Sequence, residues 1–229
     1  MRLKIAVTKI SCLIGKHPYK TSSETVKDIV YFLKRRKKPR RNKYSKIETQ
    51  LRQTSFYPWY TKANVVTSRM RKIARCVVNK ACNDAGVRFN RPINYFSKMR
   101  GQVQEPMCIA RYERLVESRM TDQQKYITKR FDDFDVVGAI DGICQGEVIE
   151  IKCRSSNLKK TPEWELIQLQ VYCYILGLPG RLVQYEGPSV KQTKVTLEDS
   201  TKTFNELLPE LIKKVDEINV LLPNESEEG

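Results

Sequence analysis

The sequence predicts one domain of mixed α/β class, in which a helical, basic N-terminal region precedes a cluster of strands covered by helices. Three observations support this prediction. The chain has 229 residues, enough to bury a full core in one domain. Apolar residues recur with helical spacing in the first half, whereas strand-like alternation is concentrated in residues 126–153. There is no internal repeat and no clean linker, so residues 1–229 are expected to form a single domain.

The N-terminal region is expected to be mostly helical. Residues 3–8 alternate apolar and charged side chains, which fits a short strand or the entry to a helix over residues 7–14. Residues 22–36 predict a helix with one apolar face, which Pro39 ends. Residues 63–85 predict a longer amphipathic helix. Its expected outward residues are Arg69, Arg71, Lys72, Arg75 and Lys80.

Aromatic residues are frequent between residues 39 and 60, where no clear periodicity exists. They are Tyr44, Phe56, Tyr57, Trp59 and Tyr60. Such side chains beside basic residues either stack on nucleic-acid bases or anchor a loop to the core. We favour the anchoring role.

The second half is expected to contain the strands and three further helices. The expected strands cover residues 126–131, 136–140, 147–153, 182–185 and 193–197, with a Gly-bounded turn between the second and third. The expected helices cover residues 99–118, 164–176 and 203–220. Pro106 is expected in the first turn of its helix, where proline is tolerated.

The positive charge is confined to the first half. The formal net charge is +16, and residues 1–100 contain 26 Lys and Arg against 4 Asp and Glu, whereas residues 101–229 contain 16 against 22. Polyanion binding is therefore expected in the first half. The densest run, residues 34–43, fits phosphate contacts, a nuclear-import signal or a solvated loop. It lacks the amphipathic Trp/Phe/Leu face that membrane insertion needs.

The cysteine and histidine content argues against several kinds of site. Seven cysteines include no Cys-x-x-Cys pair, and His17 is the only histidine. We therefore expect neither a zinc site nor a cysteine-protease site. Free, mostly buried thiols in a reducing compartment fit better. With no run of about 18 apolar residues, the chain is expected to be intracellular, cytoplasmic or nuclear, without a membrane partner.

The most informative motif lies in residues 138–153. Asp141 is followed nine residues later by Glu150, Ile151 and Lys152 on a strand-like segment. On a strand, Glu150 and Lys152 point to one face, while Ile151 points into the core and leaves its carbonyl available. Such oxygens suit a hard divalent ion, and the ammonium could orient or deprotonate water or stabilise developing charge. An ordinary Glu/Lys pair on an exposed strand is the alternative.

Four segments together resemble a nuclease family. The pattern Asp141-x8-Glu150-x-Lys152 resembles the PD-(D/E)xK nuclease superfamily, with Ile140 in place of the usual proline. More closely, four segments in order are similar to the YqaJ and phage lambda exonuclease family of viral recombinases. They are residues 8–20, Arg100-Gly101-x-x-x-Glu105-Pro106, residues 138–153, and Gln168-x-Gln170-x-Tyr172.

This resemblance implies a restriction-endonuclease-like fold, with a central mixed β-sheet flanked by helices, and a Mg²⁺ site that also accepts Mn²⁺. The implied ligands are Asp141, Glu150 and the carbonyl of Ile151, and Glu105 at a second metal or its water shell. Lys152 becomes the catalytic lysine. Without the resemblance, Glu105 would be interpreted as an acid near a helix N-terminus.

The resemblance also implies a catalytic role for Gln168, in positioning water, phosphate or Lys152, and a packing role for Tyr172. Without it, Gln168 would be interpreted as a surface residue. Thr8 and Ser11 are implied to help hold a terminal phosphate. The full set of expected DNA contacts is Thr8, Ser11, Lys16, Lys34, Arg35, Arg36 and Arg100.

The long separation of the first two segments suggests a division of the chain. Residues 21–99 would form a basic helical insert, residues 100–220 the catalytic core, and residues 221–229 a disordered acidic tail.

The expected function is a Mg²⁺-dependent deoxyribonuclease, in the first place a 5′-to-3′ exonuclease on double-stranded DNA in recombination, repair or viral genome processing. The alternatives are a structure-specific or single-strand endonuclease of the same fold and a nucleic-acid-binding protein without catalysis. A single-strand annealing or recombination protein is a candidate partner, and an oligomer and a virus-encoded origin remain open.

Overall fold

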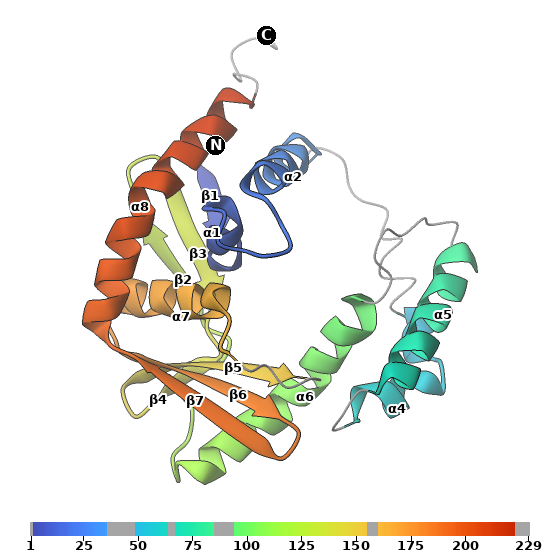
Figure 1. Cartoon of the computed structure of the whole chain (residues 1–229). Coiled ribbons are helices and arrows are strands. Elements are labelled where there is room, and N and C mark those ends of the chain that lie inside the picture. Colours follow the sequence, from blue (N-terminus) through green and yellow to red (C-terminus); the bar gives the residue numbers. More distant parts are fainter. Residues whose placement is uncertain (1, 36–48, 64–66, 85–93, 155–159, 223–229) are drawn as a thin grey trace.

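The structure is a computed structural model that describes residues 2–35, 49–63, 67–84, 94–154 and 160–222. Its strands form two sheets (Figure 1). The first has the order β1 (Leu3–Ala6), β3 (Phe134–Ala139), β2 (Tyr126–Arg130), and the second has the order β4 (Gly142–Cys144), β5 (Glu147–Arg154), β6 (Gly180–Glu186), β7 (Ser189–Val195). Each sheet contains one parallel pair, β1 with β3 and β5 with β6. The mixed α/β class is confirmed, with the strands divided between two mixed sheets.

The segment expected to be a simple turn before β5 contains a further strand. β4 pairs antiparallel with β5, with Gly142 opposite Ile149. The turn itself is reduced to Gln145 and Gly146, which both have positive φ, 51° and 76°. The prediction was wrong here because a three-residue strand is too short to show alternation. Asp141 therefore lies where the chain passes from the first sheet to the second.

Helices cover both sheets. In the N-terminal region they are α1 (Val7–Leu13) and α2 (Ser22–Arg35), and in the C-terminal region α7 (Glu163–Leu176) and α8 (Leu197–Val220). α2 begins with a capping box, since the N–H of Glu24 bonds Oγ1 of Thr21 and the Thr21 N–H bonds Oε2 of Glu24. α8 begins at Leu197 rather than at 203, because Thr196 caps it by accepting from the N–H of Asp199 at 3.0 Å.

The remaining helices are α4 (Phe56–Thr61), α5 (Ser68–Asp84) and α6 (Asn94–Leu115). α5 starts later than expected, and α6 starts earlier than the expected residue 99. Pro106 is therefore in the interior of α6, not in its first turn. The helix extends towards its N-terminus because Phe96 and Met99 are buried against α4 and α5, which offsets the backbone hydrogen bond that proline removes.

The apolar side chains form three clusters. The largest joins α1, α2, α7 and α8 to both sheets. A second joins α4 and α5 to the first half of α6, and a third packs the second half of α6 on β5 and β6. Phe56 and Tyr60 belong to the second cluster, which confirms their anchoring role, whereas Trp59 is half-exposed and Tyr44 lies outside the described residues.

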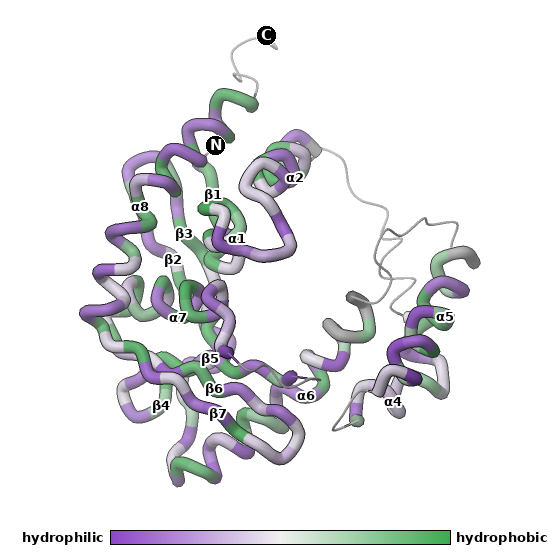
Figure 2. The backbone as a smooth tube through the Cα atoms, in the orientation of Figure 1, coloured by the Kyte–Doolittle hydropathy of each residue, from purple (hydrophilic) through white to green (hydrophobic). Residues whose placement is uncertain are grey.

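Hydropathy along α5 matches the amphipathic pattern expected for it (Figure 2). The five basic residues predicted to face outward are all exposed, and Met70, Ala74 and Val78 are buried. The cysteines are free, and Cys76 alone among them is exposed. In the described part of the chain, no helix is both long enough and apolar enough to cross a membrane. Most of the acidic tail, from residue 223, lies outside the described residues.

A substitution at Gly138 should destabilise the fold. A Cβ atom at this position of β3 would lie 2.7 Å from Cε1 and 2.9 Å from the hydroxyl of the buried Tyr172, so the ring would have to move. Gly138→Ala should lower the free energy of unfolding by about 1–3 kcal/mol, measured by denaturant unfolding. Gly101→Ala is the matched control, because nothing lies within 4 Å of its Cβ position and alanine favours a helix. Equal stability of the two variants would contradict the prediction.

Candidate active site

Asp141 is held beside the centre of β5. Its Oδ2 atom accepts a hydrogen bond of 2.7 Å from the backbone N–H of Ile151. Asp141 therefore meets the Glu150-Ile151-Lys152 segment in space. Because the N–H and C=O of one strand residue point to the same side, the carbonyl of Ile151 also faces Asp141 rather than β6.

Glu150, Lys152 and Gln168 contact one another on the face of β5 that α7 covers. Nζ of Lys152 contacts Oε1 of Glu150 and lies 3.4 Å from Oε1 of Gln168. Nε2 of Gln168 donates to Oε1 of Glu150 at 2.8 Å and to the hydroxyl of Tyr172 at 3.5 Å. One amide thus orients both members of the ion pair, and the buried Tyr172 lies beneath it.

The second oxygen of Glu150 has no hydrogen-bond partner among the described residues. Glu150 is only 2% exposed, and a buried carboxylate oxygen is costly unless a donor or a cation approaches it. Hard divalent ions take oxygen ligands, so Glu150, Asp141 and the Ile151 carbonyl fit such an ion. No three His, Cys, Asp or Glu side chains of the described ranges are grouped to hold a metal, so backbone oxygen and water would complete its shell.

Glu105 approaches Asp141 from α6, and Gln124 joins the two. Nε2 of Gln124 donates to Oε1 of Glu105 at 2.7 Å and to Oδ1 of Asp141 at 3.4 Å. The backbone of Gln124 has φ 55°, a left-handed conformation that is uncommon outside glycine. Sequence reasoning missed Gln124, which lies in the turn before β2 and carries no motif.

Burial raises the pKa of all three carboxyl groups. For Glu150 it reaches about 7, although the charge of Lys152 offsets part of the rise. The pKa of Asp141 is raised by burial and lowered in part by the Ile151 N–H. The pKa of Glu105 is raised by burial and by the charge of Asp141. The charge of Asp141 thus acts on both Glu150 and Glu105.

The pKa of Lys152 is set by two opposing effects. Burial lowers it, but the negative charges of Glu150 and Asp141 outweigh burial and raise the pKa above its ordinary value. Lys152 therefore keeps its proton at neutral pH.

A buried network beside Lys152 was also missed. Arg154, two residues further along β5, contacts Oε2 of Glu165 through Nη2. Gln184 donates to the same oxygen at 3.1 Å, and Glu165 is 7% exposed. The signal for it was available, because Glu165 precedes Gln168 by three residues and shares its face of α7.

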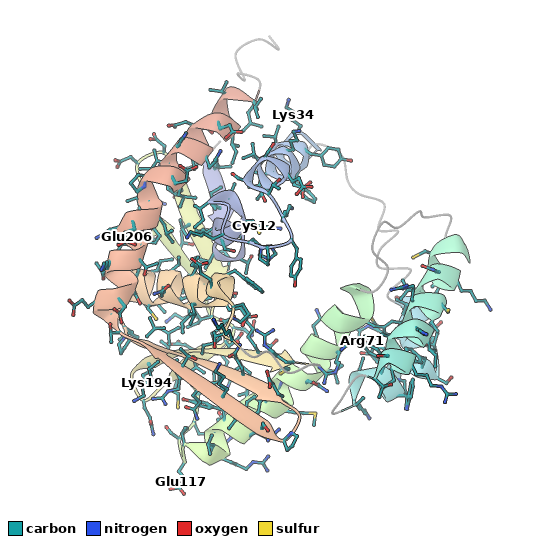
Figure 3. The ribbon with its side chains drawn as sticks, viewed as in Figure 1. Cys12, Lys34, Arg71, Glu117, Lys194 and Glu206 are labelled. Atoms are coloured by element: carbon teal, nitrogen blue, oxygen red, sulfur yellow. The ribbon has the colours of Figure 1, made fainter. Side chains whose placement is uncertain are left out.

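Several residues expected to contact DNA are at the surface. Thr8 and Lys34 are exposed, and exposed Lys16 lies 3.2 Å from the carboxylate of Glu163. Figure 3 places Lys34 at the end of α2 and Arg71 on α5.

Other expected DNA contacts are not at the surface. Ser11 and Arg100 are almost fully buried, and Arg100 donates to the carbonyl of Ala63 at 3.0 Å. The side chain of Arg35, and Arg36 with the rest of the basic run to residue 43, lie outside the described residues.

Comparison with known proteins gives matches by structure and none by sequence. No protein-family model and no curated protein matches the chain. A structure from Eubacterium rectale described as "Putative exonuclease" is 11% identical, with 96% of this chain and 83% of that chain covered and a TM-score of 0.52. The alkaline exonuclease LHK-Exo from Laribacter hongkongensis is 15% identical, with 78% and 95% covered and a TM-score of 0.45. At these identities the likeness concerns the fold alone.

The residues of the motif lie together at the centre of the fold. Asp141 and the Glu150-Ile151-Lys152 strand form the centre, with α6 on one face of β5 and α7 on the other. The chain has a restriction-endonuclease-like fold. The resemblance found in the sequence is thereby confirmed at the level of the fold.

The raised pKa of Glu150 predicts that the metal-free protein loses stability as the pH rises. Its pKa is about 7 in the folded protein against an ordinary 4.5, so the folded state keeps a proton that the unfolded chain releases. Between pH 4.5 and 7 unfolding therefore becomes easier, by up to about 3 kcal/mol. Thermal unfolding in EDTA from pH 5 to 8 measures this. Glu150→Gln, which cannot ionise, should show a smaller fall; an identical fall in that variant would contradict the assignment.

Proposed function

We propose that this protein is a metal-dependent deoxyribonuclease that hydrolyses DNA phosphodiester bonds, acting as a 5′-to-3′ exonuclease on double-stranded DNA. The observation that carries the proposal is the buried Glu150 oxygen, which has no hydrogen-bond partner in the described part of the chain and lies next to Asp141 and the ammonium of Lys152. A buried carboxylate with an unsatisfied oxygen destabilises the fold, and a bound cation would remove that cost.

The residues that would hold the ion are Asp141, Glu150 and the carbonyl of Ile151. Mg²⁺ is the ion that these oxygens suit, with Mn²⁺ as a substitute. When bound, such an ion supplies an activated water and neutralises charge on the phosphoryl oxygens.

Lys152 would hold the phosphate. An ammonium has three N–H donors, and Glu150 and Gln168 accept two of them. The third would donate to a non-bridging phosphoryl oxygen, where charge develops during hydrolysis. Gln168 keeps Lys152 in place through its contacts with Glu150 and Tyr172.

Glu105 and Gln124 would act on the other side of Asp141. The amide of Gln124 holds the two carboxylates together. We assign Glu105 to a second ion or to the water shell of the first, and Gln124 to setting the separation of Glu105 from Asp141.

DNA as the substrate rests on the charge of the first half and on the exposed basic face of α5. Neutralising phosphates by Lys and Arg releases counterions and supplies affinity. We propose the exonuclease mode and its polarity because the sequence resembles the YqaJ and phage lambda exonuclease family. The same resemblance is the ground for proposing a role in recombination or repair.

Loss of any central residue should abolish cleavage. Asp141→Ala, Glu150→Ala and Lys152→Ala should each lower the cleavage rate about 100-fold or more, because the first two remove ligands of the proposed ion and the third removes the ammonium that would stabilise charge at the phosphate. The assay follows end-labelled linear duplex with Mg²⁺ and with EDTA. Glu206→Ala and Lys194→Ala are matched controls, since both residues are exposed and should retain full activity. Full activity of Glu150→Ala would contradict the proposed site.

The same assay with a covalently closed circle tests the mode of attack. An exonuclease needs an end and should leave the circle intact, while the 5′-labelled linear strand releases labelled mononucleotide first. Cleavage of the circle would indicate an endonuclease of the same fold.

Mg²⁺ binding should be visible without catalysis. At ten times its dissociation constant, Mg²⁺ should raise the melting temperature by about 3 °C. The rise should be larger at pH 8 than at pH 6, because protons compete with the ion for Glu150. Asp141→Asn should reduce the rise and Glu206→Gln should not. An equal rise in both variants would mean that the ion binds elsewhere.

A further inference from the structure

Two free thiols contact each other beside the candidate active site. Sγ of Cys153, on β5, donates to Sγ of Cys108, on α6, at 2.7 Å. The two residues are 45 positions apart in the sequence, and neither belongs to a disulfide. The fold therefore brings together two thiols that no local spacing connects.

A small cavity gives access to both thiols. Its volume is about 50 Å³, and Cys108 and Cys153 are among the residues that line it. This is room for a few water molecules, and therefore for a molecule of the size of hydrogen peroxide. Cys153 is partly exposed, whereas Cys108 is buried. A small oxidant can therefore reach the pair.

The surroundings of the pair are positively charged. Lys62, Arg100 and Arg111 also line the cavity, and among its described lining residues none is Asp or Glu. The hydrogen bond from Cys153 lowers the pKa of Cys108, and the charges of Arg111 and Arg100 lower it further, against the effect of burial. Reactive thiols occupy electropositive, partly exposed places of this kind, whereas inert ones lie in apolar surroundings.

Each thiol belongs to an element that supplies a residue of the candidate active site. Cys108 follows Glu105 by three residues on α6, about 4.5 Å along the helix. Cys153 directly follows Lys152 on β5 and points to the opposite face of the strand. A bond between the two sulfur atoms would therefore join the turn of α6 that carries Glu105 to the strand that carries Lys152.

We infer that Cys108 and Cys153 form a redox modification site, at which hydrogen peroxide joins the two thiols in a disulfide that slows cleavage. The effect on cleavage rests on the proposed function. The thiolate of Cys108 attacks one peroxide oxygen, which breaks the O–O bond, releases water and leaves a sulfenic acid. The sulfur of Cys153 then displaces the remaining oxygen as a second water. Two thiols are oxidised to one disulfide, and the peroxide is reduced to two molecules of water.

The new bond would move the turn that carries Glu105. A covalent S–S bond is shorter than the contact between the two thiols, so one element must shift by a fraction of an ångström. Cys153 is held in the sheet by its pairing with Tyr185, whereas Pro106 removes one backbone hydrogen bond of α6 beside Glu105. α6 is therefore the element that moves. Because catalytic groups tolerate only small displacements, cleavage should slow.

Thiol chemistry tests the site without DNA. All proteins carry Cys76→Ser, which removes the exposed thiol. Hydrogen peroxide should link Cys108 to Cys153, as shown by mass spectrometry of peptides before and after reduction. The closed loop should raise the melting temperature by about 10 °C, and dithiothreitol should reverse the rise. Peroxide that leaves both thiols free, or that joins either of them to another cysteine, would overturn the inference.

Variants assign the rise in melting temperature to this pair. Cys108→Ser should abolish the rise, and Cys108→Ala repeats the measurement with a side chain that has no polar atom. Cys144→Ser is the matched control, because Cys144 is buried in the same apolar cluster as Cys108. It should keep the full rise. An equal rise in the Cys108 and Cys144 variants would mean that another cysteine reacts.

Cleavage of end-labelled duplex with Mg²⁺ is then measured in the reduced, oxidised and re-reduced protein. Oxidation should lower the rate about 10-fold, reduction should restore it, and Cys108→Ala should cleave at its reduced rate under all three conditions. An unchanged rate in protein whose disulfide is complete would overturn the inferred control of cleavage. A protein that forms the disulfide but cleaves no DNA when reduced would contradict the proposed function and leave the modification site intact.

Discussion

The burial of one carboxylate, that of Glu150, sets requirements on residues far from it in the second half of the chain. A carboxyl group that is 2% exposed needs donors or a cation beside it. Lys152 is fixed by the alternation of β5, but Gln168 is present only because α7 packs on that face of the strand. α7 in turn depends on Tyr172, and Tyr172 depends on the absence of a side chain at Gly138. The site is therefore supported by packing that extends into the first sheet.

Those parts of the site that depend on local spacing could be predicted from the sequence. Glu150 and Lys152 share a face because strands alternate, and Gln168 and Tyr172 share a face because helices repeat every four residues or so. The turn residue Asp141 was placed by a motif. In each case the relevant neighbours lie within a few residues, or within a pattern of fixed length, and the structure brings them together.

Other features depend on contacts between segments that are distant in the sequence. The spacing of residues along the chain does not predict such contacts. Gln124 bridges Glu105 and Asp141 from a turn without a motif. α6 starts early because Phe96 and Met99 pack against α4 and α5. The sequence near α6 does not indicate these contacts. The division into two sheets depends on where the chain leaves β3. Charge counting indicated polyanion binding but not that Arg100 would be buried.

α6 belongs to two packing units at once. Its first half is buried with α4 and α5, its second half is buried on β5 and β6, and Glu105 lies between them, followed by a proline that weakens the helix at that point (Figure 1). In this architecture the position of Glu105 depends on the packing at both ends of one helix: α4 and α5 hold the end before it, and β5 and β6 hold the end after it.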